Sequence, residues 1–214
     1  YGCAENDSGG MRGSALDSWM PGLNDYEVVI MGPGMTSSSD TEALVRRVLS
    51  EREGPLVLDA DALNVSARDI GMLKNSRADI VMTPHPGEMA RLMNCDTATV
   101  QRDRTAVACE IAGKLGVTVI LKGAGSVVAS RSGEAAVNTT GNPGMATGGC
   151  GDVLSGIVGA LLGQGLVGYD AAKLAVHVHG RAGDLVANSG GQLSLLPRDL
   201  TACLGEAFRG VAPR

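Results

Sequence analysis

Four short segments of the chain are apolar at almost every position, at residues 27–31, 55–59, 79–83 and 117–121. Uninterrupted apolar character is typical of β-strands that are covered on both faces, as in a parallel sheet. Segments with apolar residues at helical spacing separate these runs. This alternation favours a mostly parallel central sheet with helices on both faces. The pattern therefore predicts the α/β fold class.

The rest of the pattern completes the predicted order of elements. Helices are expected at residues 41–51, 66–74, 99–115, 152–162, 170–188 and 198–208, and a hairpin at 126–130 and 135–138. Residues 1–21 are polar and glycine-rich without periodicity, which is typical of a surface loop. No internal repeat or linker divides the remainder, so a single domain is expected.

Composition narrows the class of protein. The 214 residues are 44% hydrophobic and 19% charged, as in an ordinary globular chain, and only 2% are aromatic, so aliphatic side chains must build the core. A net charge of −5 without a basic run argues against a nucleic-acid partner. No apolar run of about 18 residues indicates a membrane span. Five widely spaced cysteines lack a metal-ligand pattern and indicate reduced thiols in the cytoplasm.

Ligands of parallel α/β proteins bind at the carboxyl ends of the strands, and this chain carries unusual loops there. A Gly-Pro-Gly turn at residues 32–34 follows the first predicted strand, either as a tight turn or as a close approach of backbone to a ligand. Asp59 and Asp61 follow the second strand. Their carboxylates can orient a magnesium-bound water or a hydroxyl, and Asp61 or Asn64 can equally cap the next helix.

The loops after the third and fourth predicted strands add a histidine and a lysine. Prolines on both sides fix the backbone of His85, which makes it a better ligand candidate than His177 or His179 within a helical pattern. Glu88 can cap the following helix or act in catalysis. The fourth loop has the sequence Lys122-Gly123-Ala124-Gly125-Ser126. Its lysine carries a compact positive charge suited to phosphate and stands next to two glycines, but the P-loop pattern is not present.

A glycine-dense loop leads directly into an apolar helix near residue 150. Gly148, Gly149 and Gly151 let the backbone close on an anion, and the first N–H groups of a helix lack intrahelical partners. Asp152 stands at this junction, where a carboxylate would repel a phosphate. It therefore either accepts a proton from a group beside the phosphate or caps the helix. Cys150 offers a backbone N–H or, through the helix start, a reactive thiolate.

Five of these motifs occur in an order that resembles a known family. Their sequences are GPG, DADALN, TPHPGE, LKG and NPGMATGGCGD, at residues 32–34, 59–64, 83–88, 121–123 and 142–152. Over residues 27–190 the chain is similar to the ADP- or ATP-dependent NAD(P)H-hydrate dehydratases of the ribokinase-like superfamily. The resemblance implies a hydro-lyase that removes water from the S-form of hydrated NADH or NADPH while ADP or ATP is consumed, with ADP preferred.

The resemblance also implies roles for individual residues. Gly34, His85 and Asp152 would contact the hydrated cofactor, with Asp152 as the catalytic base. Residues 122–126 and Gly151 would hold the adenine nucleotide. Backbone N–H groups would form an anion hole for the transferred phosphate, from Gly148, Gly149, Cys150 and Gly151. Magnesium is the expected metal, and its assignment to Asp59 and Asp61 is an inference from carboxylate chemistry alone.

Two features of the chain depart from the family pattern. Cys150 stands where many relatives have serine, which a backbone contact tolerates. The family also has an opening strand, a glycine-rich loop and a long helix ahead of the point where this chain starts. Residues 1–26 are therefore expected to be a surface loop left from a truncated N-terminal part, and residues 27–214 a single ribokinase-like domain.

Two other classes of function compete with the dehydratase. Small-molecule kinases of the ribokinase-like type, acting on hydroxymethylpyrimidine, thiazole or pyridoxal, share the Gly-Cys-Gly-Asp motif. A non-catalytic nucleotide-binding module is the third class. The TPHPGE and NPGM segments favour the dehydratase. By family habit a homo-oligomer is expected, without nucleic acid or membrane as a partner.

Overall fold

The structure is a computed structural model that describes residues 3–7, 9–15, 17, 20–209 and 211. Its centre is a six-stranded sheet in which the strands stand in chain order. The strands are β1 Val29–Met31, β2 Leu56–Leu58, β3 Ile80–Met82, β4 Thr118–Leu121, β5 Val127–Ala129 and β6 Ala135–Val137. The first four run parallel, and β5 and β6 extend the sheet as an antiparallel hairpin. The predicted sheet and hairpin are confirmed.

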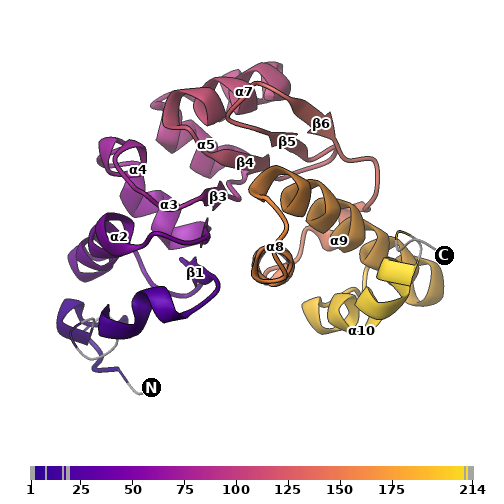
Figure 1. Ribbon diagram of the computed structural model, residues 1–214. Helices are drawn as coiled ribbons and strands as arrows, with labels where there is room; N and C mark the ends of the chain where they lie inside the picture. Colours follow the sequence, from indigo (N-terminus) through magenta and orange to yellow (C-terminus); the bar gives the residue numbers. More distant parts are fainter. Residues whose placement is uncertain (1–2, 8, 16, 18–19, 210, 212–214) are drawn as a thin grey trace.

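Helices form a layer on each side of the sheet (Figure 1). The first layer contains α2 Ser39–Glu51, α3 Ala60–Ser66, α4 Gly71–Lys74, α5 Pro86–Met93, α6 Thr97–Arg102 and α7 Arg104–Leu115. The second contains α8 Cys150–Gly163, α9 Gly168–Gly190 and α10 Pro197–Arg209. Among the described residues, no helix combines the length and the apolar character that a membrane span requires.

Alternate residues of one strand face opposite layers, which explains why the strand sequences are apolar throughout. Leu56 and Leu58 of β2 lie in the core beneath the first layer, whereas Val57 between them packs with α8 and α9. Each of the three is 0% exposed. A strand buried on both faces has no position where a polar side chain reaches water.

Two predicted helices differ from the structure, and in each region an aspartate caps the start of a helix. The helix expected at 66–74 is replaced by α3 and α4, and α3 begins at Ala60 because Asp59 caps it. The helix expected at 99–115 is split into α6 and α7, because Asp103 accepts a hydrogen bond from the N–H of Ala106 at 2.9 Å and starts α7. Aspartate oxygens satisfy the free N–H groups of a helix start, so each of these aspartates fixes where a helix begins.

The segment ahead of β1 is more ordered than the surface loop predicted for it. It contains the 3-10 helices η1 Gly13–Ala15 and η2 Met20–Asp25, and Leu23 is only 2% exposed. Arg52 is itself buried and donates hydrogen bonds to the carbonyls of Leu23 and Glu27 at 2.8 and 2.9 Å. These contacts hold η2 against the end of α2. Residues 1, 2, 8, 16, 18 and 19 lie outside the described residues.

Candidate active site

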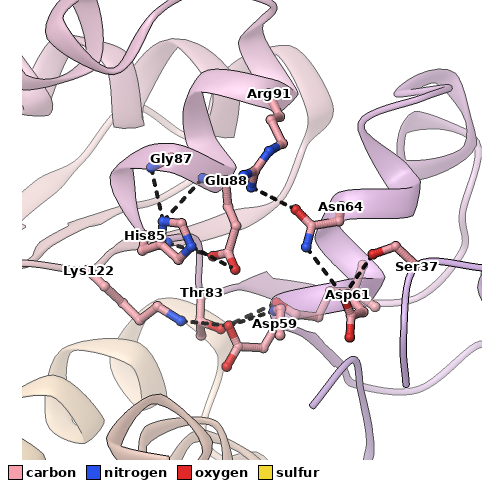
Figure 2. Close-up of polar contacts among 12 residues, drawn as sticks. Ser37, Asp59, Asp61, Asn64, Thr83, His85, Gly87, Glu88, Arg91 and Lys122 are labelled. Carbon is pink, nitrogen blue, oxygen red and sulfur yellow. Dashed lines mark hydrogen bonds and ion pairs between the residues drawn. The ribbon is translucent and has the colours of Figure 1, made fainter. Parts of the chain in front are cut away.

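A partly buried ion pair joins the carboxyl ends of β2 and β4. The Lys122 ammonium lies 2.7 Å from Oδ1 of Asp59, whose side chain is 1% exposed (Figure 2). Oδ1 of Asp59 also accepts the N–H of Ala60 at 2.9 Å, and Ser155 of α8 donates to Oδ2 at 2.7 Å. Three segments far apart in the sequence therefore meet at this carboxylate, as expected for loops at one edge of a parallel sheet.

The first predicted loop lies against the second. Gly32 has a φ of +124°, and a Cβ at this position would overlap the carbonyl of Asp59. Only glycine permits both the conformation and the close approach. Gly34 has a φ of +71°, is exposed, and has no atom within 4 Å of the place of a Cβ. The loop is therefore both a tight turn and open backbone at Gly34, where the resemblance expects the hydrated cofactor.

His85 starts helix α5 and caps it. Its Nδ1 accepts the N–H groups of Gly87 and Glu88 at 3.0 and 3.3 Å, and Glu88 accepts the N–H of His85 at 2.8 Å (Figure 2). The structure thus confirms the capping role of Glu88 and forms a complete capping box. Because Nδ1 is an acceptor, the proton of the neutral ring is on Nε2, which lies 3.2 Å from Glu88 Oε1.

Burial shifts the pKa values of both His85 and Glu88 toward their neutral forms. Burial lowers the pKa of His85, and the nearby Lys122 and Arg91 lower it further. Burial raises the pKa of Glu88. The imidazole is half exposed, with a side-chain exposure of 50%. His85 therefore presents a neutral ring at the edge of the site, while its Nδ1 is occupied by the helix.

The loop after β4 is held by an arginine that the sequence analysis missed. Arg104 of α7 donates to the carbonyls of Leu121, Lys122 and Gly125 at 2.9, 3.2 and 3.4 Å. Gly123 has a φ of +143°, and a Cβ there would lie 2.5 Å from the Arg104 guanidinium. The segment 122–126, which is predicted to bind the nucleotide, is thus a turn held in place by Arg104. Nothing in the local sequence marks Arg104, because its partners are 17 to 21 residues away.

Helix α8 begins without a side-chain cap. Gly149 takes the N-cap position with a φ of +91°, and no side chain accepts a hydrogen bond from the first turn. Within the described part of the chain, the N–H groups of Gly148, Gly149, Gly151 and Asp152 have no acceptor. The N–H of Cys150 differs, because it donates to the carbonyl of Thr147 at 3.2 Å. Of the four residues predicted to form an anion hole, only Cys150 has its N–H paired within the described part of the chain.

Asp152 is exposed at this open helix start and forms no hydrogen bond or ion pair with any described residue. It forms no capping hydrogen bond, so the expected capping role is not seen, and its role as the catalytic base stays a prediction. The ammonium of Lys122 lies 3.3 Å from the place of a Cβ on Gly151. A cation, free N–H groups and an unpaired carboxylate therefore converge on one turn of helix.

Helix α9 supports the loop that precedes α8. Asp184 accepts the N–H of Gly141 at 2.9 Å and the side-chain amide of Asn142 at 3.1 Å. Thr140 packs so closely on Gly180 that a Cβ there would overlap it. His179 and the carbonyl of Cys150 are joined by a hydrogen bond of 2.9 Å. The loop is therefore fixed by side chains more than 25 residues away along the chain.

Burial determines the state of two groups beside this helix start. It lowers the pKa of His179 to about 4, so the ring is neutral near pH 7 and donates from Nε2 to the Cys150 carbonyl. Burial raises the pKa of the Cys150 thiol. The alternative of a reactive thiolate at Cys150 is therefore not supported, and the side chain packs in the core between α8, α9 and α10.

Asp59 and Asp61, the residues expected to hold magnesium, both accept hydrogen bonds from other groups of the protein. Asp59 already accepts three hydrogen bonds from the protein, and Asp61 accepts the Ser37 hydroxyl at 2.8 Å and the Asn64 amide at 3.5 Å. Among the described residues, no group of three acidic, histidine or cysteine side chains is placed to hold a metal. The Asp59 carboxylate is buried and three of its about four lone-pair positions are already used, which leaves little room for a direct bond to a metal.

Comparison with known proteins identifies the family. A family model described as NAD(P)H-hydrate dehydratase matches residues 9–205. The chain belongs to the NAD(P)H-hydrate dehydratase family. It is 41% identical over 207 residues to the bifunctional NAD(P)H-hydrate repair enzyme Nnr of Moorella thermoacetica, covering 97% of this chain and 39% of the relative. It is 41% identical over 170 residues to the ADP-dependent (S)-NAD(P)H-hydrate dehydratase of Neisseria meningitidis, covering 78% of this chain and 57% of that protein.

Solved structures confirm the fold. A ribokinase-like superfamily protein from Enterococcus faecalis superposes with a TM-score of 0.81 at 27% identity, over 94% of this chain and 69% of the other. The ADP/ATP-dependent NAD(P)H-hydrate dehydratase of Bacillus subtilis, co-crystallised with ATP/Mg2+, gives a TM-score of 0.79 at 28% identity. The match covers 92% of this chain and 70% of that chain. The predicted ribokinase-like fold is thus confirmed. The chain spans about two fifths of the length of the bifunctional relatives that it matches.

Proposed function

We propose that this chain catalyses the ADP- or ATP-dependent dehydration of the S-form of hydrated NADH or NADPH. The observation that carries the proposal is the unpaired Asp152 carboxylate beside the free N–H groups that open α8. Family membership supports the substrate class, and the ADP-dependent relative favours ADP as the nucleotide. The nucleotide is consumed as a co-substrate.

The chemistry follows from the leaving group. A hydroxyl on the reduced nicotinamide ring leaves poorly, and phosphorylation turns it into a good leaving group. Asp152 accepts the hydroxyl proton while that oxygen attacks the terminal phosphate, and the bond from this phosphate to the rest of the nucleotide breaks. The ring nitrogen then donates its lone pair, the C–O bond breaks, inorganic phosphate leaves, and loss of a ring proton restores NAD(P)H.

The remaining groups of the site stabilise charge on the transferred phosphate. Lys122 lies beside Gly151, and we infer that its ammonium and the unpaired N–H groups of Gly149 and Gly151 stabilise that charge. The positive end of the α8 dipole acts in the same direction. Gly34 and His85 are the proposed contacts with the hydrated cofactor. Magnesium, which would screen the phosphates, is proposed to arrive bound to the nucleotide, since Mg²⁺ is usually held by substrate phosphates and few protein carboxylates.

The experiment is to mix the protein with hydrated NADH and ADP and to follow the absorbance of the restored dihydronicotinamide. We expect NADH and phosphate to form in equal amounts. Accumulation of a phosphorylated product without NADH would instead indicate a small-molecule kinase. Nucleotide binding without any turnover would indicate a binding module.

We also infer a cytoplasmic location and a homo-oligomeric state. The five cysteines are free, as is usual in a reducing compartment. The oligomeric state follows from family habit, and sedimentation of the purified protein tests it.

A further inference from the structure

Lys122 of the Asp59–Lys122 pair is a proposed phosphate contact, whereas Asp59 itself is not placed against the reacting groups. The Lys122 side chain is 20% exposed and the Asp59 side chain 1% exposed, so one end of the pair faces solvent and the other is buried. Burying charges costs free energy, which such a pair recovers only partly. Stabilisation of the fold therefore does not explain why this ion pair lies at the edge of the site.

The Lys122 ammonium is placed where a cation is disfavoured. It lies against the first turn of α8, 3.3 Å from the place of a Cβ on Gly151. The start of a helix carries partial positive charge, which repels an ammonium. Asp59 supplies the opposing charge at 2.7 Å and keeps Lys122 there.

The carboxylate is tied to the same helix from the other side. Ser155, one turn further along α8, donates to Oδ2 of Asp59 at 2.7 Å and is 1% exposed. Thr83 at the end of β3 lies 3.5 Å from the Ser155 hydroxyl. These buried hydrogen bonds fix the Asp59 carboxylate relative to α8. The carboxylate in turn fixes the position of the flexible Lys122 side chain.

We propose that Asp59 is a positioning residue that acts through Lys122. It holds the ammonium beside the free N–H groups of Gly151 and Asp152, so that cation and helix start bind the same polyphosphate. This inference rests on the proposed function, because it needs a phosphate-bearing nucleotide at α8. It gives Asp59 a role distinct from metal ligation.

The test measures ADP binding by calorimetry, in magnesium buffer and in EDTA. We expect Lys122→Met to weaken binding about 10–100-fold, as for loss of a hydrogen bond to a charged group. Asp59→Asn keeps the shape of the side chain but removes its charge, and we expect about 3–10-fold weaker binding in both buffers. In the Lys122→Met background, the same Asp59→Asn change should have no further effect.

Four outcomes would overturn the proposal. Tighter binding by Asp59→Asn would mean that its charge only repels the phosphates. A loss confined to magnesium buffer would make Asp59 a metal ligand, and an equal loss with and without Lys122 would make its role structural. Failure of the unchanged protein to bind ADP would instead remove the proposed function itself.

Two further variants keep the test decisive. Asp170→Asn breaks another lysine–aspartate pair, with Lys173 at 2.9 Å on the surface of α9, and should leave ADP binding unchanged. If Asp59→Asn does not fold, Ser155→Ala keeps the ion pair and frees the carboxylate from α8. We then expect about 2–5-fold weaker ADP binding that disappears in the Lys122→Met background, and unchanged binding would overturn the proposal.

Discussion

Helices α5 and α8 begin at the same edge of the sheet but treat their first N–H groups in opposite ways. In α5, His85 accepts two of these groups and Glu88 accepts the N–H of His85 itself. In α8, a glycine takes the cap position, and the N–H groups of Gly151 and Asp152 stay without an acceptor among the described residues. One helix start is closed by the protein's own side chains, and the other is open to a ligand.

The difference supports separate proposed roles for the two helix starts. A capped start is satisfied and holds its neighbours in place, which suits a residue such as His85 at the rim of the site. An uncapped start keeps its partial charge for an anion. The start of α8 lacks the stabilisation of a side-chain cap. Contacts from α9 support this region instead, with His179 bonded to Cys150 and Asp184 bonded to the preceding loop.

Replacing the carboxylate at the open helix start should have the largest effect. Asp152→Asn keeps the shape of the side chain but cannot accept the hydroxyl proton. We expect the turnover of hydrated NADH to fall by about 10²–10⁴-fold, while calorimetry shows ADP binding retained. Unchanged turnover would show that this carboxylate is not the base.

The low pKa of His179, which bonds to the start of α8, should make the free energy of unfolding depend on pH. The folded pKa of His179, about 4, lies below the usual 6.5, so between these values only the unfolded chain binds the proton. The free energy of unfolding should therefore fall as the pH drops from 6.5 to 4, by up to about 3 kcal/mol from this group. Urea denaturation across this range measures it.

A matched variant isolates this contribution from the titrating carboxylates. His179→Gln keeps an N–H donor for the Cys150 carbonyl but does not titrate. We expect its stability to depend less steeply on pH than that of the unchanged protein. Parallel curves would exclude His179 as the source.

A methyl group at the cap of α8 should reduce stability and ligand binding together. Alanine at the φ of Gly149, +91°, costs about 1–2 kcal/mol, and its Cβ would lie 3.0 Å from Pro197. We expect Gly149→Ala to unfold at lower denaturant and to bind ADP more weakly. Gly165, beyond the other end of α8, has the same φ and open space around it, so Gly165→Ala should lose stability alone. Equal ADP binding by both variants would contradict an open anion site.

The smallest effect is expected at the closed helix start. His85→Ala removes the cap of α5 and should lower the free energy of unfolding by about 1 kcal/mol, whereas His85→Asn keeps an acceptor and most of the stability. If the imidazole also contacts the hydrated cofactor, both variants should raise KM. A stable alanine variant would show that His85 does not cap α5 in solution.

Much of this architecture could be predicted because it depends on local order in the sequence. Strands buried on both faces have no polar positions, so β2, β3 and β4 were recognisable as apolar runs. The hairpin of β5 and β6 and the three C-terminal helices follow the predicted order. Glu88 was expected to cap a helix, but the bounds of α5 were not predicted, because its N-cap residue, His85, is not a usual cap residue.

The sequence alone determined the order of strands and helices, the motif series that marks the family, and the glycines that open α8. Only the tertiary structure paired Asp59 with Lys122 and Ser155, which stand 63 and 96 residues away along the chain. It alone also revealed Arg104 and Asp184 as supports of the two ligand loops. Burial produces a pattern that can be read from consecutive residues. Hydrogen bonds between distant segments instead depend on how the sheet brings the ends of its strands together.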